Sequence, residues 1–404
     1  MGESVERKLS RWSFPFPVVL FLLFSPSPVL PFLLACVLPH GGSRPTPPPQ
    51  LELIPPQHVP AFLDDLDRSS LKTATLQSLA ALQKKEDMQT LALGEEHIPI
   101  TRVRASLEAF LALLESNTEL SSRLTQEFAV YRVTTPVLFT GYYEPVLKGS
   151  LVRTERYRYP LYRRPDDLVE VDLAAFFPER AGEKVYGRVE NGKLFPYFSR
   201  AEIDGQGVFE GKRYELAWVD DPVARFFLHI QGSGQIQLPD GTRLRIGYAA
   251  TNGKPYTSIG KVLLQQGKLR SGQTSAPEIR RYLYAHPTEQ DLIFFHNSRY
   301  VFFQPVSDGP RGSLGVPLTP GRSLATDPRI YPSGALGFLR TRRPVVDQNE
   351  HVTWQEFSRF VLFQDSGAAI TGWTRADLFW GSEGEREAGY MAQEGELFLL
   401  LKKP

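Results

Sequence analysis

The chain has 404 residues, of which 42% are hydrophobic and 23% charged, and its formal net charge is +1. These are the proportions of a globular protein, and the length is sufficient for two domains. The balanced charge, with no long run of one sign, gives no reason to expect nucleic acid as a partner.

Cysteine and histidine are placed in a way that argues against a metal or disulfide framework. The one cysteine, Cys36, excludes an internal disulfide, and the seven histidines form no H-x-H or H-E-x-x-H pair. The sequence therefore predicts no metal site of the usual His/Cys type and no cofactor.

Residues 1–36 have the pattern of an export signal, in which basic residues precede an uncharged apolar stretch. The several prolines of this stretch disfavour a straight membrane-spanning helix. The stretch ends in Leu-Leu-Ala-Cys, which resembles a bacterial lipobox with Cys36 as the acylated residue. A plain secretory signal and an uncleaved anchor are the alternatives. Residues 37–60 are rich in proline and are expected to form a semi-rigid tether.

Leucines at near-helical spacing predict helices over residues 61–131. An apolar strand is expected next, over residues 137–148, and it carries Thr140, Gly141, Tyr142 and Tyr143. Paired tyrosines beside a glycine suit stacking on a sugar ring, which has one apolar face. Half-buried strand aromatics are an equally good interpretation of the same pattern.

Residues 150–290 are predicted to be mostly β. They contain a hairpin around an Asp-Gly turn at 235–246 and two short helices at 258–266 and 277–286. A polar turn precedes the hairpin, formed by Gln231, Gly232, Ser233 and Gly234. The change in sequence texture near 150 and 290 predicts domain junctions there.

Residues 291–404 contain short apolar runs that are separated by glycine and proline. Strands are expected at 300–304, 316–318, 323–327 and 330–334, with a closing strand at 397–401. This spacing predicts a small barrel.

Two acids of this last region, Asp365 and Asp377, lie twelve residues apart at the edges of apolar segments. A carboxyl group against large apolar side chains is disfavoured as an anion, so its pKa rises, and this keeps an acid protonated near neutral pH. Arg375 shares a strand face with Asp377 and would lower its pKa, but we expect burial to dominate because the arginine can turn towards solvent. Either acid could instead bond nearby backbone N–H groups, Asp365 at Ser366-Gly367.

Short motifs, in this order, resemble the membrane-bound lytic murein transglycosylase A family over most of residues 130–400. They are F-T-G-Y-Y-x-P (139–145), Y-P-L-Y-R-x-P (159–165), Q-G-S-G (231–234), S-I-G-K-V-L (258–263), Y-V-F-F (300–303), V-P-L (316–318), and Q-D-S-G-x-A-I-x-G followed by D-L-F-x-G. Each motif is weak by itself, and the ordered set is specific.

The resemblance implies a mainly β chain with N-terminal helices. Residues 61–149 and 291–404 would form a double-psi β-barrel domain, with a second β domain, 150–290, inserted and a glycan groove between them. The family cleaves the bond between N-acetylmuramic acid and N-acetylglucosamine in peptidoglycan without water, leaving 1,6-anhydromuramoyl ends. Its single catalytic acid matches Asp377, and a second acid matches Asp365.

The expected partners are peptidoglycan glycan strands and, through the N-terminal anchor, a membrane. This would place the protein on the periplasmic side of the outer membrane, or otherwise export it to the periplasm. Cell-wall synthesis or division proteins are further candidate partners. The groove contacts are expected from the residues of the 140–143 and 231–234 motifs.

Three other functions compete with this interpretation. A hydrolase would use both Asp365 and Asp377, and its product would end in a reducing sugar. An aspartic protease needs two D-[ST]-G motifs that share a proton, whereas the chain has one. A non-catalytic glycan-binding module would show no turnover that depends on Asp377.

The lipobox prediction can be tested directly. We expect labelled fatty acid to be incorporated into the wild-type chain and not into Cys36→Ser, because only the thiol of Cys36 can carry the lipid. Equal labelling of both chains would end the lipoprotein interpretation.

Overall fold

The computed structural model describes residues 50–116, 120–180 and 182–404. The predicted signal and its Cys36 lie outside these residues. In the part that is described, no helix is long and apolar enough to cross a membrane.

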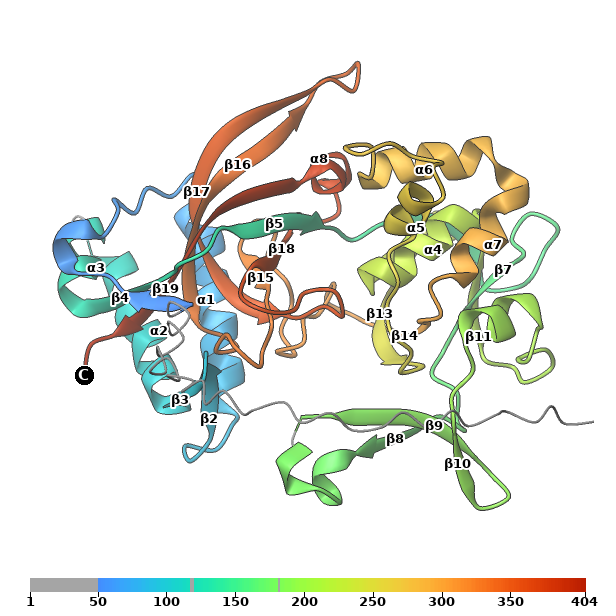
Figure 1. Ribbon diagram of the computed structural model, residues 1–404, viewed down its shortest axis with the longest axis horizontal. Coiled ribbons are helices and arrows are strands. Elements are labelled where there is room, and N and C mark those ends of the chain that lie inside the picture. The colour runs from blue at the N-terminus through green and yellow to red at the C-terminus, as the bar shows by residue number, and fades with distance from the viewer. Residues whose placement is uncertain (1–49, 117–119, 181) are drawn as a thin grey trace, which may run out of the picture. The chain divides into compact units, whose positions relative to one another are not determined.

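Six strands form a closed ring (Figure 1). In ring order they are β19 (Ala392–Lys402), β16 (Leu336–Val346), β17 (Val352–Asp365), β15 (Ser323–Ala325), β18 (Arg375–Phe379) and β5 (Val137–Tyr142). The ring closes because β5 also pairs with β19. The β15–β17 and β18–β5 pairs are parallel and the others are antiparallel. The predicted small barrel and its closing strand are confirmed.

Two further strands extend this sheet beyond β19. These are β4 (Phe128–Val133) and then β1 (Leu51–Leu53), which pairs with β4 although it falls in the stretch predicted as a tether. Large apolar side chains of these strands form a core, in which the ring centroids of Phe338 and Phe360 are 5.0 Å apart and Phe62 contacts both.

Helices α1 (Arg68–Gln83) and α2 (Ile100–Glu115) bury apolar stripes in the same core. The Asp67 side chain begins α1 by accepting a hydrogen bond from the Ser70 N–H at 2.7 Å. The predicted helical region is interrupted by the hairpin of β2 (Thr90–Leu93) and β3 (Glu96–Pro99). The prediction missed this hairpin because leucine spacing alone does not report a break.

The part of the chain between β5 and β15 contains a second sheet of six strands. Its order is β14 (Val301–Pro305), β13 (Arg243–Thr251), β12 (Gly234–Gln237), β6 (Val146–Ser150), β11 (Glu215–Val219) and β7 (Tyr159–Tyr162). The β12–β13 hairpin matches the prediction. A separate small sheet contains β10 (Lys193–Pro196), β9 (Lys184–Glu190) and β8 (Val169–Asp172).

The remaining elements are short. They are α3 (Leu120–Glu127), α4 (Pro222–Gln231), α5 (Ile259–Gln265), α6 (Ala276–Ala285), α7 (Gln290–Phe295), α8 (Glu385–Tyr390), and the helical turns η1 (Pro56–His58), η2 (Leu173–Ala175), η3 (Pro178–Arg180), η4 (Ala201–Gly205) and η5 (Pro287–Glu289). Helices α5 and α6 confirm the two predicted after residue 250.

The expectation of mostly β structure over 150–290 is wrong for α4. Its start has the signals of a helix, because Asp221 accepts hydrogen bonds from Val223 N–H (2.8 Å) and Ala224 N–H (3.1 Å) and Pro222 occupies the first turn. The expected strands at 316–318 and 330–334 are also wrong. The second of these is a turn in which Asp327 O accepts from the Ile330 and Tyr331 N–H groups.

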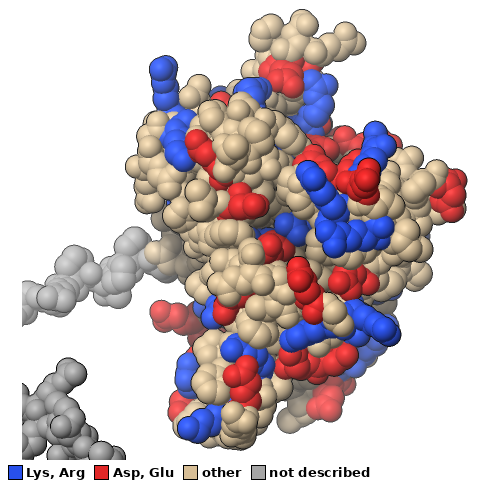
Figure 2. Space-filling view, turned by 90° about the vertical axis from the view of Figure 1, so that its right-hand side faces the viewer, with Lys and Arg blue, Asp and Glu red and all other residues tan. Residues whose placement is uncertain are grey.

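Acidic and basic side chains are interspersed over the face shown in Figure 2. That face presents no large field of one sign, as expected from the net charge of +1.

Two buried arginines join the segment before α1 to the barrel, namely Arg359, which pairs with Asp65 at 2.7 Å, and Arg322. Arg322 has no exposed surface, and its Nη1 lies 2.7 Å from Asp64 Oδ2 and 3.0 Å from Phe360 O. Its Nη2 donates to Asp67 O at 2.9 Å. This guanidinium therefore connects β15, β17 and the cap of α1.

We expect Arg322→Ala to lower the free energy of unfolding by about 3–5 kcal/mol, because it leaves Asp64 without its buried partner. Chemical denaturation measures this. The matched control is Arg340→Ala, whose ion pair with Glu396 (3.4 Å) is half-exposed and should contribute less than about 1 kcal/mol. Equal, small losses for both variants would contradict the structural role of Arg322.

Candidate active site

The two acids singled out from the sequence lie on neighbouring strands of the barrel. Asp365 ends β17 and Asp377 lies in the middle of β18, and strand β15 pairs with both. Ala325 is the register partner of Asp365 on one side and of Asp377 on the other. The sheet itself therefore brings the two carboxyl groups together.

Asp377 is half-buried and has one hydrogen-bond donor. Thr140 Oγ1, from the paired strand β5, donates to Asp377 Oδ1 at 2.8 Å. Its Oδ2 has no hydrogen-bond partner within residues 50–116, 120–180 and 182–404. Burial raises the pKa of Asp377 to about 6, against the opposing effects of Thr140 and Arg375. The expectation that burial dominates over Arg375 is confirmed.

Asp365 is occupied on both oxygens. Its Oδ1 accepts from the N–H groups of Ser313 (2.9 Å) and Ser366 (2.8 Å), and its Oδ2 accepts from the Tyr142 hydroxyl (2.8 Å). Burial raises its pKa, while these three hydrogen bonds oppose the shift. The predicted bond to the turn at Ser366 is confirmed.

The acids lie in two adjoining cavities that share Tyr142, Ile230 and Gln231. The first, here called the Asp377 arm, has a volume of about 710 Å³ and is also lined by Tyr256 and Trp354. The second, the Asp365 arm, has a volume of about 740 Å³. Together they form a groove with one of the two aspartates in each arm.

The structure brings most of the predicted contact residues to this groove. Thr140, Gly141, Tyr142 and Gln231 line the Asp377 arm, and Tyr142, Gln231, Gly232 and Ser233 line the Asp365 arm. At Gly141 a Cβ atom would lie 2.7 Å from the Cα of Ala388, so only glycine allows α8 to pack here.

Tyr143 and Gly234 line neither arm. Tyr143 is 3% exposed, and its hydroxyl donates to Glu385 Oε1 at 2.9 Å. Its backbone N–H donates to Gln231 Oε1 at 3.0 Å, which fixes the end of α4 against the chain after β5. A Cβ atom at Gly234 would lie 2.5 Å from Leu228 Cδ1, so this position requires the small residue for packing.

Sequence reasoning missed several groove residues, namely Tyr186, Tyr248, Tyr256, Arg299 and Trp354. They come from separate strands and loops, and none has a motif of its own. For the aromatic ones, the residue type was the only signal in the sequence, and 12% of all residues in the chain are aromatic.

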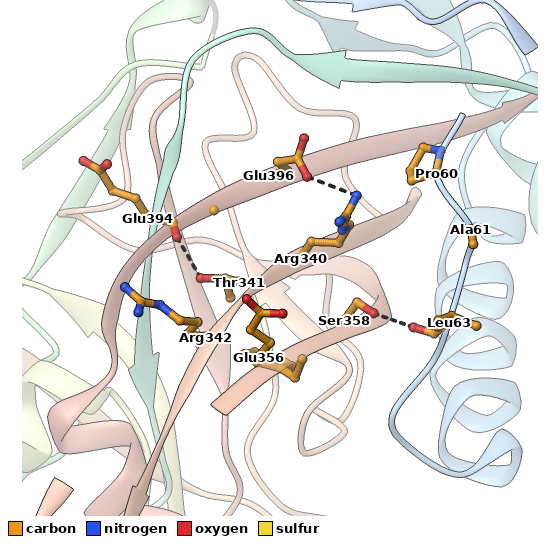
Figure 3. Close-up of a pocket in the computed structure, with 12 residues that line it drawn as sticks. Pro60, Ala61, Leu63, Arg340, Thr341, Arg342, Glu356, Ser358, Glu394 and Glu396 are labelled. Atoms are coloured by element: carbon orange, nitrogen blue, oxygen red, sulfur yellow. Dashed lines mark hydrogen bonds and ion pairs between the residues drawn. The ribbon is translucent and has the colours of Figure 1, made fainter. Parts of the chain in front are cut away.

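A third hollow, of about 650 Å³, lies over the outer face of β16, β17 and β19 (Figure 3). Neither acid lines it. Its polar groups are largely paired, as in the Arg340–Glu396 ion pair and the bond from Thr341 Oγ1 to Glu394 O (2.9 Å). We therefore regard it as a solvated sheet face.

Among the described residues, no group of three His, Cys, Asp or Glu side chains is placed to hold a metal ion. The groove contains the carboxyl groups of Asp365 and Asp377. One of them keeps a proton up to a pH of about 6 and has an oxygen facing the cavity. Fold and site thus define a groove-bearing β-barrel protein equipped for general acid chemistry.

Comparisons with known proteins agree with this class. A family model described as "MltA specific insert domain" matches residues 138–304, and one described as "3D domain" matches 322–401. The membrane-bound lytic murein transglycosylase A of Escherichia coli K12 is 32% identical over 273 residues. That alignment covers 66% of this chain and 66% of the E. coli protein, just under two thirds of its length.

Solved structures show the same likeness. A membrane-bound lytic murein transglycosylase from Agrobacterium tumefaciens superposes with a TM-score of 0.73 at 30% identity, over 87% of this chain and 98% of that one. E. coli MltA with bound chitohexaose superposes with a TM-score of 0.62 over 82% and 90%; at 24% identity it shows the fold alone. The chain belongs to the membrane-bound lytic murein transglycosylase A family.

The raised pKa of Asp377 predicts a link between stability and pH. The pKa of an aspartate is about 3.9 in an unfolded chain and about 6 here, so the stability that this group contributes is present below about pH 4 and is lost as the pH rises through 6. An asparagine side chain at this position would stay neutral throughout. We therefore expect Asp377→Asn to be more stable than the wild type by about 1–3 kcal/mol at pH 8.

Denaturant unfolding at pH 4 and pH 8 checks this, with little difference expected at pH 4. The contrasting variant is Asp365→Asn, which should be less stable because an amide cannot accept all three hydrogen bonds. A loss of stability in Asp377→Asn at pH 8 would show that ionised Asp377 is not destabilising.

Proposed function

We propose that this protein is a lytic transglycosylase, which cleaves the β-1,4 bond between N-acetylmuramic acid and N-acetylglucosamine in peptidoglycan and forms 1,6-anhydromuramoyl ends. The observation that carries the proposal is Asp377, a single carboxyl group with a raised pKa and an unbonded oxygen in the groove. Membership of the family supports the substrate and the reaction.

One acid is sufficient for this reaction because the nucleophile belongs to the substrate. Protonated Asp377 would donate its proton to the glycosidic oxygen as the bond to C1 breaks. The muramoyl C6 hydroxyl would then close on C1, and ionised Asp377 would accept its proton. Because this hydroxyl is already tethered, its orientation replaces the second carboxyl group that a hydrolase needs.

The environment of Asp365 favours the one-acid route over a two-acid hydrolase. A nucleophile or general base needs a free oxygen towards the substrate or a water molecule. Both Asp365 oxygens are engaged, one with two backbone N–H groups and one with Tyr142. Asp365 therefore serves to position Tyr142 and the 313 and 366 turns, and its negative charge favours the protonated form of Asp377.

The glycan would lie along both arms of the groove. Tyr142 and Gln231 are at the junction of the arms, and Thr140, Gly141, Gly232 and Ser233 flank them. Tyr143 and Gly234 would contribute by holding this wall in shape. The E. coli relative was crystallised with chitohexaose, which supports a glycan ligand for the same fold.

We extend the proposal to the architecture. The two parallel pairs in the six-strand ring support a double-psi barrel. The second sheet, running from β6 to β14, supports a domain of 150–290 inserted into 61–149 plus 291–404, although its strands reach several residues past both junctions. Lipid on Cys36 would hold the enzyme at the outer membrane.

We expect Asp377→Asn to reduce the release of anhydromuropeptides from murein sacculi by about 1,000- to 10,000-fold, because one residue carries both proton transfers. Mass spectrometry of the digest measures it. The wild-type rate should fall as the pH rises through about 6, since the starting form of the acid is protonated.

Asp365→Asn should retain more activity than Asp377→Asn. Products that end in a reducing sugar would identify a hydrolase. An unchanged rate in Asp377→Asn would place the acid elsewhere, and no glycan turnover by the wild type would leave only a binding module.

A further inference from the structure

The Asp365 arm contains a guanidinium with no partner. Arg299 lies just before β14 and lines this arm, half-buried, beside Tyr186 and Tyr248. Its side chain has no hydrogen bond to, or ion pair with, any residue that the structure describes. Burial lowers the pKa of Arg299, which means that its charge is held there unfavourably.

The other charged groups of this arm are already satisfied. Lys184 is paired with Glu170, and Arg311 donates to Asp308 Oδ1 (3.2 Å) and Gly315 O (2.6 Å). Asp365 has its three donors. An anion that enters this arm therefore finds its one unpaired cation, among the described residues, at Arg299.

The backbone that carries Arg299 is fixed in place. Buried Arg200 donates to the carbonyls of Asn297 (3.0 Å) and Arg299 (2.8 Å), and Asn252 Nδ2 donates to Ser298 O at 2.8 Å. A binding group on such a support needs little reorganisation when the ligand arrives.

From this geometry we propose that Arg299 forms a carboxylate-binding subsite, which recognises the carboxylate carried by the muramoyl residues of the glycan. The inference rests on the proposed function, and it states which group of that substrate the Asp365 arm binds. Guanidinium and carboxylate fit each other in a bidentate pair. The carboxylate is that of the lactyl group itself in a peptide-free strand, or one on the stem peptide where the lactyl group is blocked.

Such a subsite would set the register of the strand. The two sugars alternate, and only muramic acid carries a carboxylate, so a strand shifted by one sugar would bring N-acetylglucosamine to Arg299. In the correct register, C1 of a muramoyl residue meets Asp377, and its C6 hydroxyl can close the anhydro ring. Arg299 would thus direct cleavage to one of the two kinds of β-1,4 bond.

The test measures binding by calorimetry in the full chain that carries Asp377→Asn, so that ligands are not cleaved. The three probes are chitohexaose, a peptide-free hexasaccharide of alternating N-acetylglucosamine and N-acetylmuramic acid, and the same hexasaccharide with stem peptides. Adding Arg299→Gln should weaken binding of a muramoyl ligand by about tenfold or more and leave chitohexaose unchanged. Loss for the peptide-free ligand identifies the lactyl carboxylate, and loss for the peptide-bearing ligand alone identifies the stem.

Arg311→Gln is the matched control, because it removes a cation of the same arm that already has an acidic partner. It should change the affinity for the muramoyl ligands by less than about threefold. Thermal unfolding of both variants verifies that they are folded.

Equal losses for all three ligands, or no loss for either muramoyl ligand, would overturn the proposal for Arg299. If the background chain binds none of the three ligands, the proposed function itself fails. In the otherwise wild-type enzyme, Arg299→Gln should raise KM for muramoyl strands with little change in kcat, since the guanidinium does not touch the reacting atoms.

Discussion

Backbone pairing along the three-residue strand β15 is the constraint on which the site depends. Because Ala325 is opposite both Asp365 and Asp377, a shift of one residue on either side would turn one carboxyl group away from the groove. Because β15 is short, side-chain hydrogen bonds to neighbouring elements help to fix its position. Ser323 Oγ donates to Gln364 Oε1 at 2.6 Å, and Gln364 Nε2 donates to Ala74 O of α1 at 2.8 Å.

These hydrogen bonds explain how the N-terminal helix α1 contributes to a site on the β-barrel. Gln364 precedes Asp365 and is completely buried, so its amide must find partners, and α1 supplies them. Arg322, which directly precedes β15, is bonded to the segment that leads into α1. Residues more than 250 positions apart in the chain thus fix the geometry of the acids.

Features of the fold and the site that depend on neighbouring residues could be predicted from the sequence, whereas those that depend on contacts between distant segments could not. The D-G hairpin at 235–246, the capped helix after Ser258 and the acids at the edges of apolar runs are local patterns, and the structure has them where they were expected. Helix α4 is not predicted although Asp221-Pro222 is a local helix start, because it is short and lies between the strands β11 and β12, whose pattern favours β structure. The burial of Tyr143 and the pairing of Asp365 with Tyr142 could not be foreseen, since both depend on contacts between elements far apart in the chain.

The groove also contains groups that a structure selected for stability alone would not keep. Asp377 is held where its ionised form is unfavourable, and one of its oxygens has no partner in the described part of the chain. Arg299 is held where its charge is unfavourable, beside tyrosines rather than acids. The other buried charged side chains in the described part of the chain have an ionic partner, as Arg322 has Asp64 and Arg359 has Asp65. Charged groups of the groove that lack an ionic partner are best explained if the ligand supplies the partner, a glycosidic oxygen for Asp377 and a carboxylate for Arg299. The Asp377 arm would then cleave the glycosidic bond, and the Asp365 arm would recognise the sugar.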